Sequence, residues 1–391
     1  MRTQVGIVGG GPAGLTLALL LERQGIECVV LESRSREYVE RRVRAGLLEH
    51  NTVSLLHELG VGDRMGREGL RHGGIYLRRQ GRTTHIPITK LTGRHITIYG
   101  QQEVVKDEIA AWCERGGALH FEVPDVAVDD LESDRPVIEF TLDGSHERLE
   151  CDFIAGCDGF HGICRAALPD GLAVHYDYEY PFGWLGILAD AAPATDELIY
   201  AWHERGFALY TMRSSTISRL YIQVPAGERL EKWSDARIWQ ELQIRLASEG
   251  WSVNEGPILE KGITPMRTFV CEPMQFGNLF LLGDAAHIVP PTGAKGLNLA
   301  VNDARLFAEA LSSFYTSGSR SALDAFTETA LRRVWRAQDF SNYMTQLLHD
   351  LGRGPFDRML QLSRLDYLGQ STAAAHSLAE NYAGLPAAPD F

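Results

Sequence analysis

The sequence predicts an α/β fold in which a Rossmann-like βαβ unit is interrupted by a β-rich domain and followed by a helical C-terminal region. Three observations support this prediction. An apolar run, a glycine turn, a helical pattern and a β-branched strand follow one another within residues 3–32. Short alternating or aromatic runs fill residues 73–88 and 182–224. From about residue 296 onward the pattern is mostly helical.

The other elements follow from the same patterns. Ser234 has the side chain of a helix N-cap and precedes a helical segment. A buried strand at 279–282 leads into a loop rich in Pro and Gly, and a helix begins at about Gly296. A long helical run extends from Ser321 to about His349. Further helices are expected at residues 12–24, 51–59 and 101–115, and a hairpin at 73–88.

Size and charge limit the possible functions. The 391 residues suffice for two or three units, at roughly 100–200 residues per domain. A net charge of −13 disfavours a generic binder of nucleic acid or of anionic membranes. No apolar stretch is long enough to span a bilayer and no signal peptide is seen, so we expect a cytoplasmic protein. The six cysteines lack both C-x-x-C and zinc spacing, so we expect reduced thiols and no metal site.

The glycine turn has the G-x-G-x-x-G pattern, with its fixed positions at Gly9, Gly11 and Gly14. The first glycine permits the tight turn, the second lets the backbone approach a pyrophosphate, and the third lets the helix pack on the strand. Glu32 ends the second strand, eighteen residues after Gly14, where a carboxylate accepts hydrogen bonds from both ribose hydroxyls. The pattern alone is weak, but in this context it predicts a site for ADP-ribose.

Two later aspartates indicate which dinucleotide binds there. Asp158 and Asp284 each follow a strand, and each alone is most often a turn residue. Together with the glycine motif they form the pattern of an FAD-dependent hydroxylase. We expect Asp284 to meet the ribityl chain and Asp158 to support the pyrophosphate region. The loop at 290–298 would place backbone N–H groups and a helix N-terminus beside the flavin ring, where positive potential stabilises the reduced anion.

Five arginines lie between residues 34 and 44 of this acidic chain. Arg36 and Arg41 suit a solvated helix surface. Arg42 and Arg44 directly follow the ADP-binding unit and suit phosphate contact. Because the chain has no second G-x-G-x-x-G motif, a nicotinamide coenzyme would have to bind transiently on such a surface.

These assignments divide the chain into three predicted parts. Residues 1–72, 97–180 and 267–320 form a discontinuous FAD-binding domain. Residues 73–96 and 181–266 form the β-rich substrate domain, and residues 321–391 form the helical C-terminal region.

Several longer motifs occur along the chain. They are Arg42-Val-Arg44-Ala-Gly-Leu-Leu-Glu49, Tyr99-Gly-Gln101, Ala155-Gly-Cys-Asp-Gly-Phe-His-Gly162, Tyr180-Pro-Phe-Gly-Trp-Leu-Gly186, the segment from Gly283 to Leu299, and Ala379-Glu-Asn-Tyr-Ala-Gly-Leu-Pro386. With these motifs the chain resembles the 4-hydroxybenzoate 3-monooxygenase family of class A FAD-dependent aromatic hydroxylases. The similarity extends from residue 1 to about residue 386.

The resemblance implies a reaction. In this family NADPH or NADH reduces bound FAD, which reacts with O₂ to give a flavin C4a-hydroperoxide. That species hydroxylates 4-hydroxybenzoate at position 3, giving 3,4-dihydroxybenzoate. The substrate carboxylate needs a cation, its phenol must become a phenolate, and water must be excluded.

The resemblance also implies the substrate site. Arg213 matches the carboxylate-binding arginine, and the hydroxyls of Thr211 and Tyr221 complete the anion cage. Tyr200 and Tyr382 match a tyrosine pair that relays the phenol proton outward. The other residues carried over to this site are His72 at the end of the relay, Pro291 and Thr292 on the hydroxyl side of the substrate, and Trp184, Leu198 and Leu209 as apolar walls.

The remaining matches concern the two nucleotides. Arg219 matches a residue that governs the swing of the flavin between a buried and an exposed position. The FAD-binding set consists of Gly9, Gly11, Gly14, Glu32, Arg42, Arg44, Gln101, Asp158, Asp284, Leu297 and Asn298. The NAD(P)H-docking set consists of Ser33, Arg34, Tyr38, His161, Arg165 and Arg267, with Arg42 and Arg44 shared.

Departures from the family pattern leave alternatives open. Thr211 stands where serine is usual and adds a methyl group beside the carboxylate, which opens the same chemistry on 4-aminobenzoate or another hydroxybenzoate. The segment 33–36 differs from the usual coenzyme-selecting sequence and leaves the choice between NADPH and NADH open. Leu220 and the pair His50-Asn51 also differ from the family. A flavin-binding protein without catalysis is a third hypothesis, against which the intact relay tyrosines argue.

The family forms homodimers. Trp335, Phe340 and Tyr343 lie on one predicted helix and suit either a dimer interface or core packing.

Overall fold

The computed structural model describes residues 1–42, 44 and 46–385. Its first part is a six-stranded sheet in which β19, β12, β1, β2 and β8 are parallel neighbours and β18 is an antiparallel edge. In sheet order the strands are β18 (Gln275–Phe276), β19 (Leu279–Leu281), β12 (Phe153–Gly156), β1 (Val5–Val8), β2 (Cys28–Leu31) and β8 (Ala118–His120).

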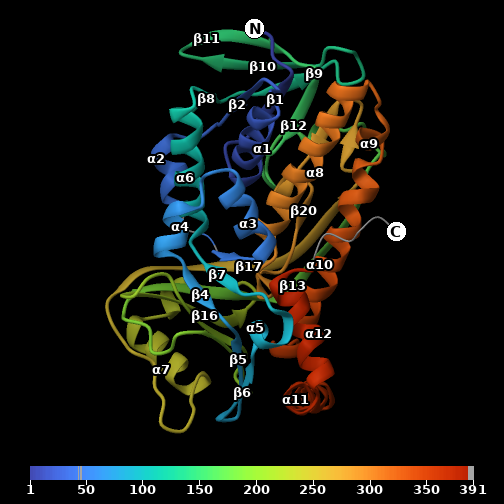
Figure 1. The fold of residues 1–391 in the computed structure, drawn as a ribbon. Coiled ribbons are helices and arrows are strands. Elements are labelled where there is room, and N and C mark those ends of the chain that lie inside the picture. Colours follow the sequence, from blue (N-terminus) through green and yellow to red (C-terminus); the bar gives the residue numbers. More distant parts are fainter. Residues whose placement is uncertain (43, 45, 386–391) are drawn as a thin grey trace.

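Helices bury this sheet, as its sequence requires. Every residue of β1, β2, β12 and β19 is buried, which is the continuous apolar pattern of a covered parallel sheet. Figure 1 shows the helices packed around it. They are α1 (Pro12–Arg23), α2 (Arg36–Arg41), α3 (His50–Glu58), α4 (Asp63–Glu68), α6 (Gln101–Glu114) and α8 (Gly296–Ser317).

The second part is an eight-stranded mixed sheet below the first (Figure 1). Side chains alternate across it with period two: Tyr200 and Trp202 face one core, and Ile199 and Ala201 face the other. In order its strands are β20 (His287–Ile288), β17 (Ile258–Glu272), β13 (Val174–Asp190), β16 (Ile217–Pro225), β15 (Ala208–Met212), β14 (Leu198–Trp202), β5 (Ile75–Arg79) and β6 (Arg82–Ile86).

Both faces of this sheet are covered. Helix α7 (Asp235–Arg245), capped by Ser234 as predicted, packs on one face through Ile238 and Leu242. The C-terminal helices pack on the other face, with Leu365 and Leu378 in a core that includes Tyr200. Strands β13 and β17 pair from Val174 to Ala189 and run through the predicted domain boundaries at 180/181 and 266/267. These two predicted boundaries therefore fall within continuous strands of the second sheet and not in linkers between domains.

Two small sheets and the C-terminal helices complete the fold. The predicted helical run from Ser321 is interrupted at Ala325, so α9 and α10 are separate helices. The small sheets are β9 (Ala127–Asp129) with β10 (Val137–Leu142) and β11 (Ser145–Glu150), and β3 (Leu47–Leu48) with β7 (Ile96–Ile98) and β4 (Leu70–His72). The remaining helices are α5 (Ile88–Thr92), α9 (Ser321–Asp324), α10 (Phe326–Leu348), α11 (Pro355–Gln370) and α12 (Thr372–Ala383), with 3₁₀ turns at Arg165–Ala167, Leu230–Lys232, Gly283–Ala285 and Pro291–Gly293.

The predicted fold class is confirmed: an α/β nucleotide-binding part, a β-rich part and C-terminal helices. No helix among the described residues is long and apolar enough to cross a membrane. The same residues contain no group of three or more His, Cys, Asp or Glu side chains arranged to hold a metal ion.

The aromatic cluster between the first sheet and helices α8 and α10 allows a test of the hydrophobic core. Phe280 is fully buried against Phe153, Phe307 and Phe326. We expect Phe280→Ala to lower the free energy of unfolding by about 3–5 kcal/mol, because it removes buried apolar surface and leaves a cavity. Urea unfolding measures this change. The control Leu259→Ala, at a side chain that is 56% exposed, should change stability by no more than about 0.5 kcal/mol. Equal effects of the two substitutions would contradict the assigned core.

Candidate functional site

The glycine turn after β1 has the geometry of a phosphate cradle. Gly9 has φ +112°, and a Cβ there would lie 2.3 Å from the carbonyl oxygen of Cys157. A Cβ on Gly14 would lie 2.0 Å from the carbonyl oxygen of Gly9. By contrast, a Cβ on Gly11 would meet nothing within 4 Å. The outer glycines are therefore required by the protein itself, whereas Gly11 borders open space that a pyrophosphate fits.

The charges around this turn suit ADP-ribose. Helix α1 begins without a side-chain cap, so the backbone N–H groups of its first turn point toward the open space. The carboxylate of Glu32 accepts from the backbone N–H of Gly10 at 2.8 Å and from that of Arg34 at 2.8 Å. These bonds fix the carboxylate at the end of β2 and leave lone pairs for ribose hydroxyls.

The two aspartates lie at the ends of neighbouring strands. Asp284 is solvent-accessible, yet burial raises its pKa against the opposing effects of His287, Arg44 and Arg42. A side chain that is both accessible and closely surrounded faces a cleft. Asp158 accepts from the backbone N–H of Cys164 at 2.8 Å and folds the loop after β12, while its other oxygen has no partner among the described residues.

Behind Asp284 lies a buried pair that sequence reasoning missed. Nε2 of His287 lies 2.6 Å from Oδ2 of Asp303, and both side chains are almost fully buried. The same oxygen accepts from the backbone N–H of Gly283 at 2.9 Å, where the chain turns at φ +61°. The pair therefore sets the turn that carries Asp284.

The loop predicted to face the flavin ring ends at an uncapped helix. A 3₁₀ turn at Pro291–Gly293 is followed by Ala294 in the left-handed region at φ +54°. Helix α8 then starts at Gly296 with no side-chain cap and no acidic residue in its first turn. Its N-terminus thus presents free N–H groups and partial positive charge, as a reduced flavin requires. Leu297 lies in this first turn.

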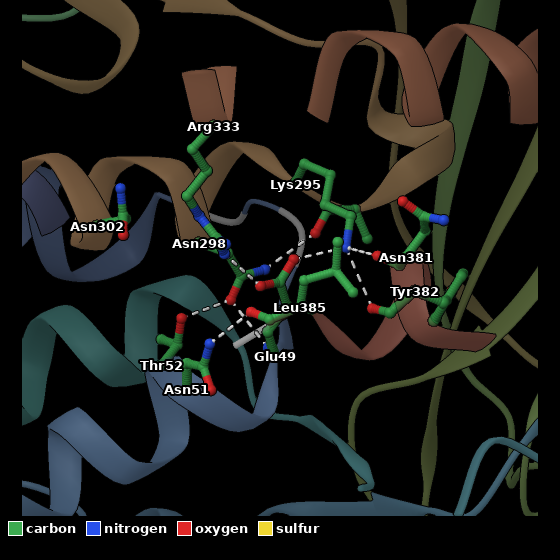
Figure 2. Close-up of polar contacts among 12 residues, drawn as sticks. Glu49, Asn51, Thr52, Lys295, Asn298, Asn302, Arg333, Asn381, Tyr382 and Leu385 are labelled. Atoms are coloured by element: carbon green, nitrogen blue, oxygen red, sulfur yellow. Dashed lines mark hydrogen bonds and ion pairs between the residues drawn. The ribbon is translucent and has the colours of Figure 1, made fainter. Parts of the chain in front are cut away.

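The carboxamide of Asn298, a residue of the predicted FAD-binding set, is held by the protein itself (Figure 2). Its Oδ1 accepts from the backbone N–H of Glu49 and from Oγ1 of Thr52, and its Nδ2 donates to the carbonyls of Leu47 and Ala294. These four bonds occupy the carboxamide. Any contact of Asn298 with flavin therefore falls to its backbone.

A buried ion pair underlies the same loop (Figure 2). Nζ of Lys295 lies 2.5 Å from Oε1 of Glu49, and Nη2 of Arg333 lies 2.6 Å from Oε2. Burial by itself would raise the pKa of Glu49, but the two cations hold it below the usual range. Lys295 also donates to the backbone carbonyls of Asn381 and Tyr382. One carboxylate thus links the loop, α10 and the end of α12.

The predicted anion cage is assembled on β15 and β16. Nη1 of Arg213 lies 3.4 Å from Oγ1 of Thr211, and Nε of Arg213 is buried without a partner among the described residues. Nε of Arg219 lies 3.4 Å from the hydroxyl of Tyr221. Burial alone would raise the pKa of Tyr221, but Arg213 and Arg219 lower it. Within the described chain no carboxylate pairs with Arg213. The cage therefore has positive charge available for an anion.

The predicted relay tyrosines meet. The hydroxyls of Tyr200 and Tyr382 lie 2.5 Å apart, both side chains are buried, and burial raises the pKa of each phenol. His72 is the last residue of β4, which precedes β5 in the chain, and neither of its ring nitrogens has a partner among the described residues. Burial lowers the pKa of His72 to about 4, so its imidazole is neutral at neutral pH. Among the described residues, no direct hydrogen bond joins His72 to Tyr382.

The predicted coenzyme residues form two groups. In one, the guanidinium groups of Arg34 and Arg42 lie 5.4 and 6.0 Å from the ring centroid of the exposed Tyr38. In the other, Arg165 and Arg267 both lie against the ring of Phe160, and His161 follows it. Arg165 donates to the carbonyls of Ala285 and Phe160, and Arg267 pairs with Asp177 at 2.6 Å.

Three comparisons place this geometry among known proteins. A protein-family profile described as an FAD binding domain matches residues 2–341. The chain is 49% identical to p-hydroxybenzoate hydroxylase of Acinetobacter baylyi over 389 residues, covering 99% of this chain and 96% of that protein. It is 25% identical to 3-amino-4-hydroxybenzoate 2-monooxygenase of Streptomyces cremeus over 77% of this chain and 76% of the relative. The crystal structure of p-nitrophenol 4-monooxygenase from Pseudomonas putida superposes with a TM-score of 0.83 at 18% identity, covering 98% of this chain and 99% of that chain.

The His287–Asp303 pair gives a test at the flavin side. Burial alone would lower the pKa of His287, but the Asp303 carboxylate raises it. Because the pKa of His287 is higher in the folded than in the unfolded protein, protonation of this histidine stabilises the fold. The stabilisation is complete below the unfolded-state pKa of about 6.5 and is lost as the pH rises through the folded-state pKa. Asp303→Asn keeps an acceptor for Gly283 but removes the charge. We expect it to cost about 3–5 kcal/mol at roughly pH 6 and less at roughly pH 9 in urea unfolding. A cost that does not change with pH would contradict this assignment.

Proposed function

The chain belongs to the p-hydroxybenzoate hydroxylase family of FAD-dependent monooxygenases, and we propose that it hydroxylates 4-hydroxybenzoate at position 3 with NAD(P)H and O₂. The main support for the proposed substrate site is the cage of Arg213, Thr211 and Tyr221. The guanidinium of Arg213 has no carboxylate partner among the described residues, and the buried pair of Tyr200 and Tyr382 is near it. A cation at one end and a proton acceptor at the other match a benzoate with a para hydroxyl.

In this proposal the substrate carboxylate binds the guanidinium of Arg213. A charge-assisted pair of this kind fixes both position and orientation. The hydroxyls of Thr211 and Tyr221 supply further donors, and Trp184 and Leu209 form apolar walls. The walls exclude water from the reacting face of the ring.

The phenol proton leaves through the tyrosine pair. The substrate hydroxyl gives its proton to the oxygen of Tyr200 while Tyr200 gives its own hydroxyl proton to Tyr382, whose hydroxyl lies 2.5 Å away, and Tyr382 passes its proton on. Tyr200 then holds the former substrate proton and donates it in a hydrogen bond to the phenolate oxygen. The hydrogen bond from Tyr200 stabilises the phenolate, and the phenolate makes the ring electron-rich. His72, neutral and with both nitrogens free among the described residues, is the proposed acceptor beyond Tyr382. The carbonyl of Pro291 and the hydroxyl of Thr292 bound the other side of the substrate oxygen.

FAD, when bound, supplies hydride acceptance and oxygen activation. The turn at Gly9–Gly14, Glu32 and Asp284 would hold its ADP and ribityl portions, with Arg42, Arg44, Gln101 and Asp158 in support. The N-terminus of α8, including Leu297, would face the ring. Arg219, which lies beside Tyr221, is proposed to govern the movement of the ring between its two positions.

NAD(P)H would dock on the exposed arginine groups. Arg36 and Arg41 are paired with Glu40 and Glu37, whereas Arg34 and Arg42 lie on Tyr38 and have no carboxylate partner among the described residues. Two unpaired guanidinium groups beside an aromatic ring fit a phosphate and an adenine. Ser33, His161, Arg165 and Arg267 are proposed to complete the docking surface.

A second substrate class rests on Thr211. Its side chain is buried, and its extra methyl group lies beside the carboxylate cage. This favours testing 4-aminobenzoate and other hydroxybenzoates alongside 4-hydroxybenzoate, because a change of one methyl group in a pocket alters discrimination by about 1–3 kcal/mol.

We further propose that the protein is a cytoplasmic homodimer. One side of α11 exposes large apolar side chains, with Phe356 77% exposed and Met359 and Tyr367 also accessible. Trp335 and Tyr343 are exposed as well, whereas Phe340 belongs to the core. Exposed apolar side chains in such numbers on neighbouring helices are typical of an interface.

Flavin reduction tests the proposed reaction. We expect 4-hydroxybenzoate to accelerate anaerobic bleaching of the protein-bound flavin by NADPH or NADH, because the family couples reduction to substrate binding. Stopped-flow absorbance measures the rates, and comparison of the two coenzymes gives the preference. Benzoate without the 4-hydroxyl group is the control ligand. No acceleration by any hydroxybenzoate would refute the proposed function.

The cage is tested by Arg213→Met. Removing the charged donor should weaken binding of 4-hydroxybenzoate roughly 10- to 150-fold, with bound FAD unchanged, because bonds to charged groups contribute about 1.5–3 kcal/mol. Titration of the flavin absorbance measures the affinity. Arg229→Met, at an exposed arginine in the same sheet region, is the control and should bind the substrate normally. Normal binding by Arg213→Met would contradict the assigned cage.

A further inference from the structure

His349 lies at the C-terminus of α10 and holds the pocket wall Trp184. The indole Nε1 of Trp184 donates to Nε2 of His349 at 2.8 Å, and the imidazole is fully buried. The two rings are nearly parallel, with 5.7 Å between centroids, and Phe182 and Phe207 enclose the imidazole at 4.5 and 4.2 Å. Trp184 in turn packs on Tyr221 of the cage, with ring centroids 4.9 Å apart.

The chemistry of this contact allows one arrangement. An indole N–H can only donate, so Nε2 of His349 must accept and carries no proton. Nδ1 then carries the proton and donates to the carbonyl of Thr345 at 3.0 Å. Burial lowers the pKa of His349 to about 3, which keeps the ring neutral. Both nitrogens are used, and the ring has a single orientation.

The helix end that carries His349 is itself fixed to the substrate sheet. Gln223, the cross-strand partner of Trp184, donates to the carbonyl of Asp350 at 2.6 Å and accepts from its N–H at 3.1 Å. One turn earlier, Oγ1 of Thr345 lies 3.0 Å from Oγ1 of Thr292 in the loop on the hydroxyl side of the pocket. The last turn of α10 therefore contacts both ends of the proposed substrate site.

We propose that His349 is a positioning residue for ring hydroxylation. It holds Trp184 against Tyr221, and together with Thr345 it fixes the spacing between the carboxylate cage and the Pro291–Gly293 turn. This inference rests on the proposed function. When the substrate ring is displaced, the two electrons from NAD(P)H reduce O₂ to H₂O₂ and no oxygen atom enters the ring. The loss of His349 would thus appear in the yield of product per coenzyme oxidised.

The test is His349→Phe, which keeps an aromatic ring in the stack but removes the acceptor. We expect bound FAD and coenzyme-driven flavin reduction to persist, while hydroxylation slows roughly 10- to 100-fold, because small displacements of a bound substrate have effects of this size. Product per NAD(P)H should fall, and H₂O₂ should account for the difference. In the background of Trp184→Phe, which has no indole donor, His349→Phe should cause little further loss.

Four outcomes are informative. A yield unchanged by His349→Phe, or an equal loss in both backgrounds, would overturn the positioning role. Leu242→Ala, in the separate core under α7, is the stability control and should lower the melting temperature without changing the yield. The comparison uses whichever benzoate the unaltered protein hydroxylates. If that substrate is not 4-hydroxybenzoate, the proposed substrate is wrong but the positioning role of His349 can still be tested. Hydroxylation of no benzoate would overturn the proposed function and the inference with it.

Discussion

The buried carboxylate of Glu49 is the point on which the rest of the structure depends. Lys295 approaches it from the loop that precedes α8 and Arg333 approaches it from α10, while the backbone N–H of Glu49 holds Asn298 at the start of α8. A buried ion pair contributes little net stability, because desolvation offsets most of its attraction, but removal of one partner is costly. Its effect is therefore on arrangement. The carboxylate connects the loop before α8 with α10, and through Lys295 it reaches the end of α12.

This arrangement connects parts of the chain that have separate chemical tasks. The carbonyl of Tyr382 accepts from Lys295, and the hydroxyl of the same residue meets Tyr200 in the sheet. The proposed proton path is thus attached through one residue to the loop that faces the proposed flavin site. The paired strands β13 and β17 run across two of the predicted domain boundaries without a break.

Sequence reasoning predicted the parts of the site that depend on local order. The glycine turn and Glu32 lie where spacing along a βαβ unit places them, Asp284 follows a strand as predicted, and the contact of Tyr200 with Tyr382 followed from the family resemblance. It missed pairs such as His287 with Asp303 and Trp184 with His349. A buried histidine has the same appearance in sequence as an ordinary core residue, and its partner is identified only when helices pack. The Asn298 carboxamide shows the same limit, because three of its four bonds go to residues 47–52, which are distant in the sequence.

The chain has 33 arginines and five lysines, and the role of an arginine depends on whether a carboxylate pairs with it. Most exposed arginines are neutralised by nearby carboxylates, as Arg36 and Arg41 are on a single turn of α2. In an acidic protein this pairing is the default, since carboxylates outnumber cations. A buried arginine with neither a carboxylate nor an acceptor for every donor has a desolvation cost, and such a cost persists where an anion from outside offsets it. Arg213 is buried beside a tyrosine and a second arginine, and among the described residues it has no carboxylate partner and no acceptor for Nε, so this one side chain marks an anion site better than the total charge does.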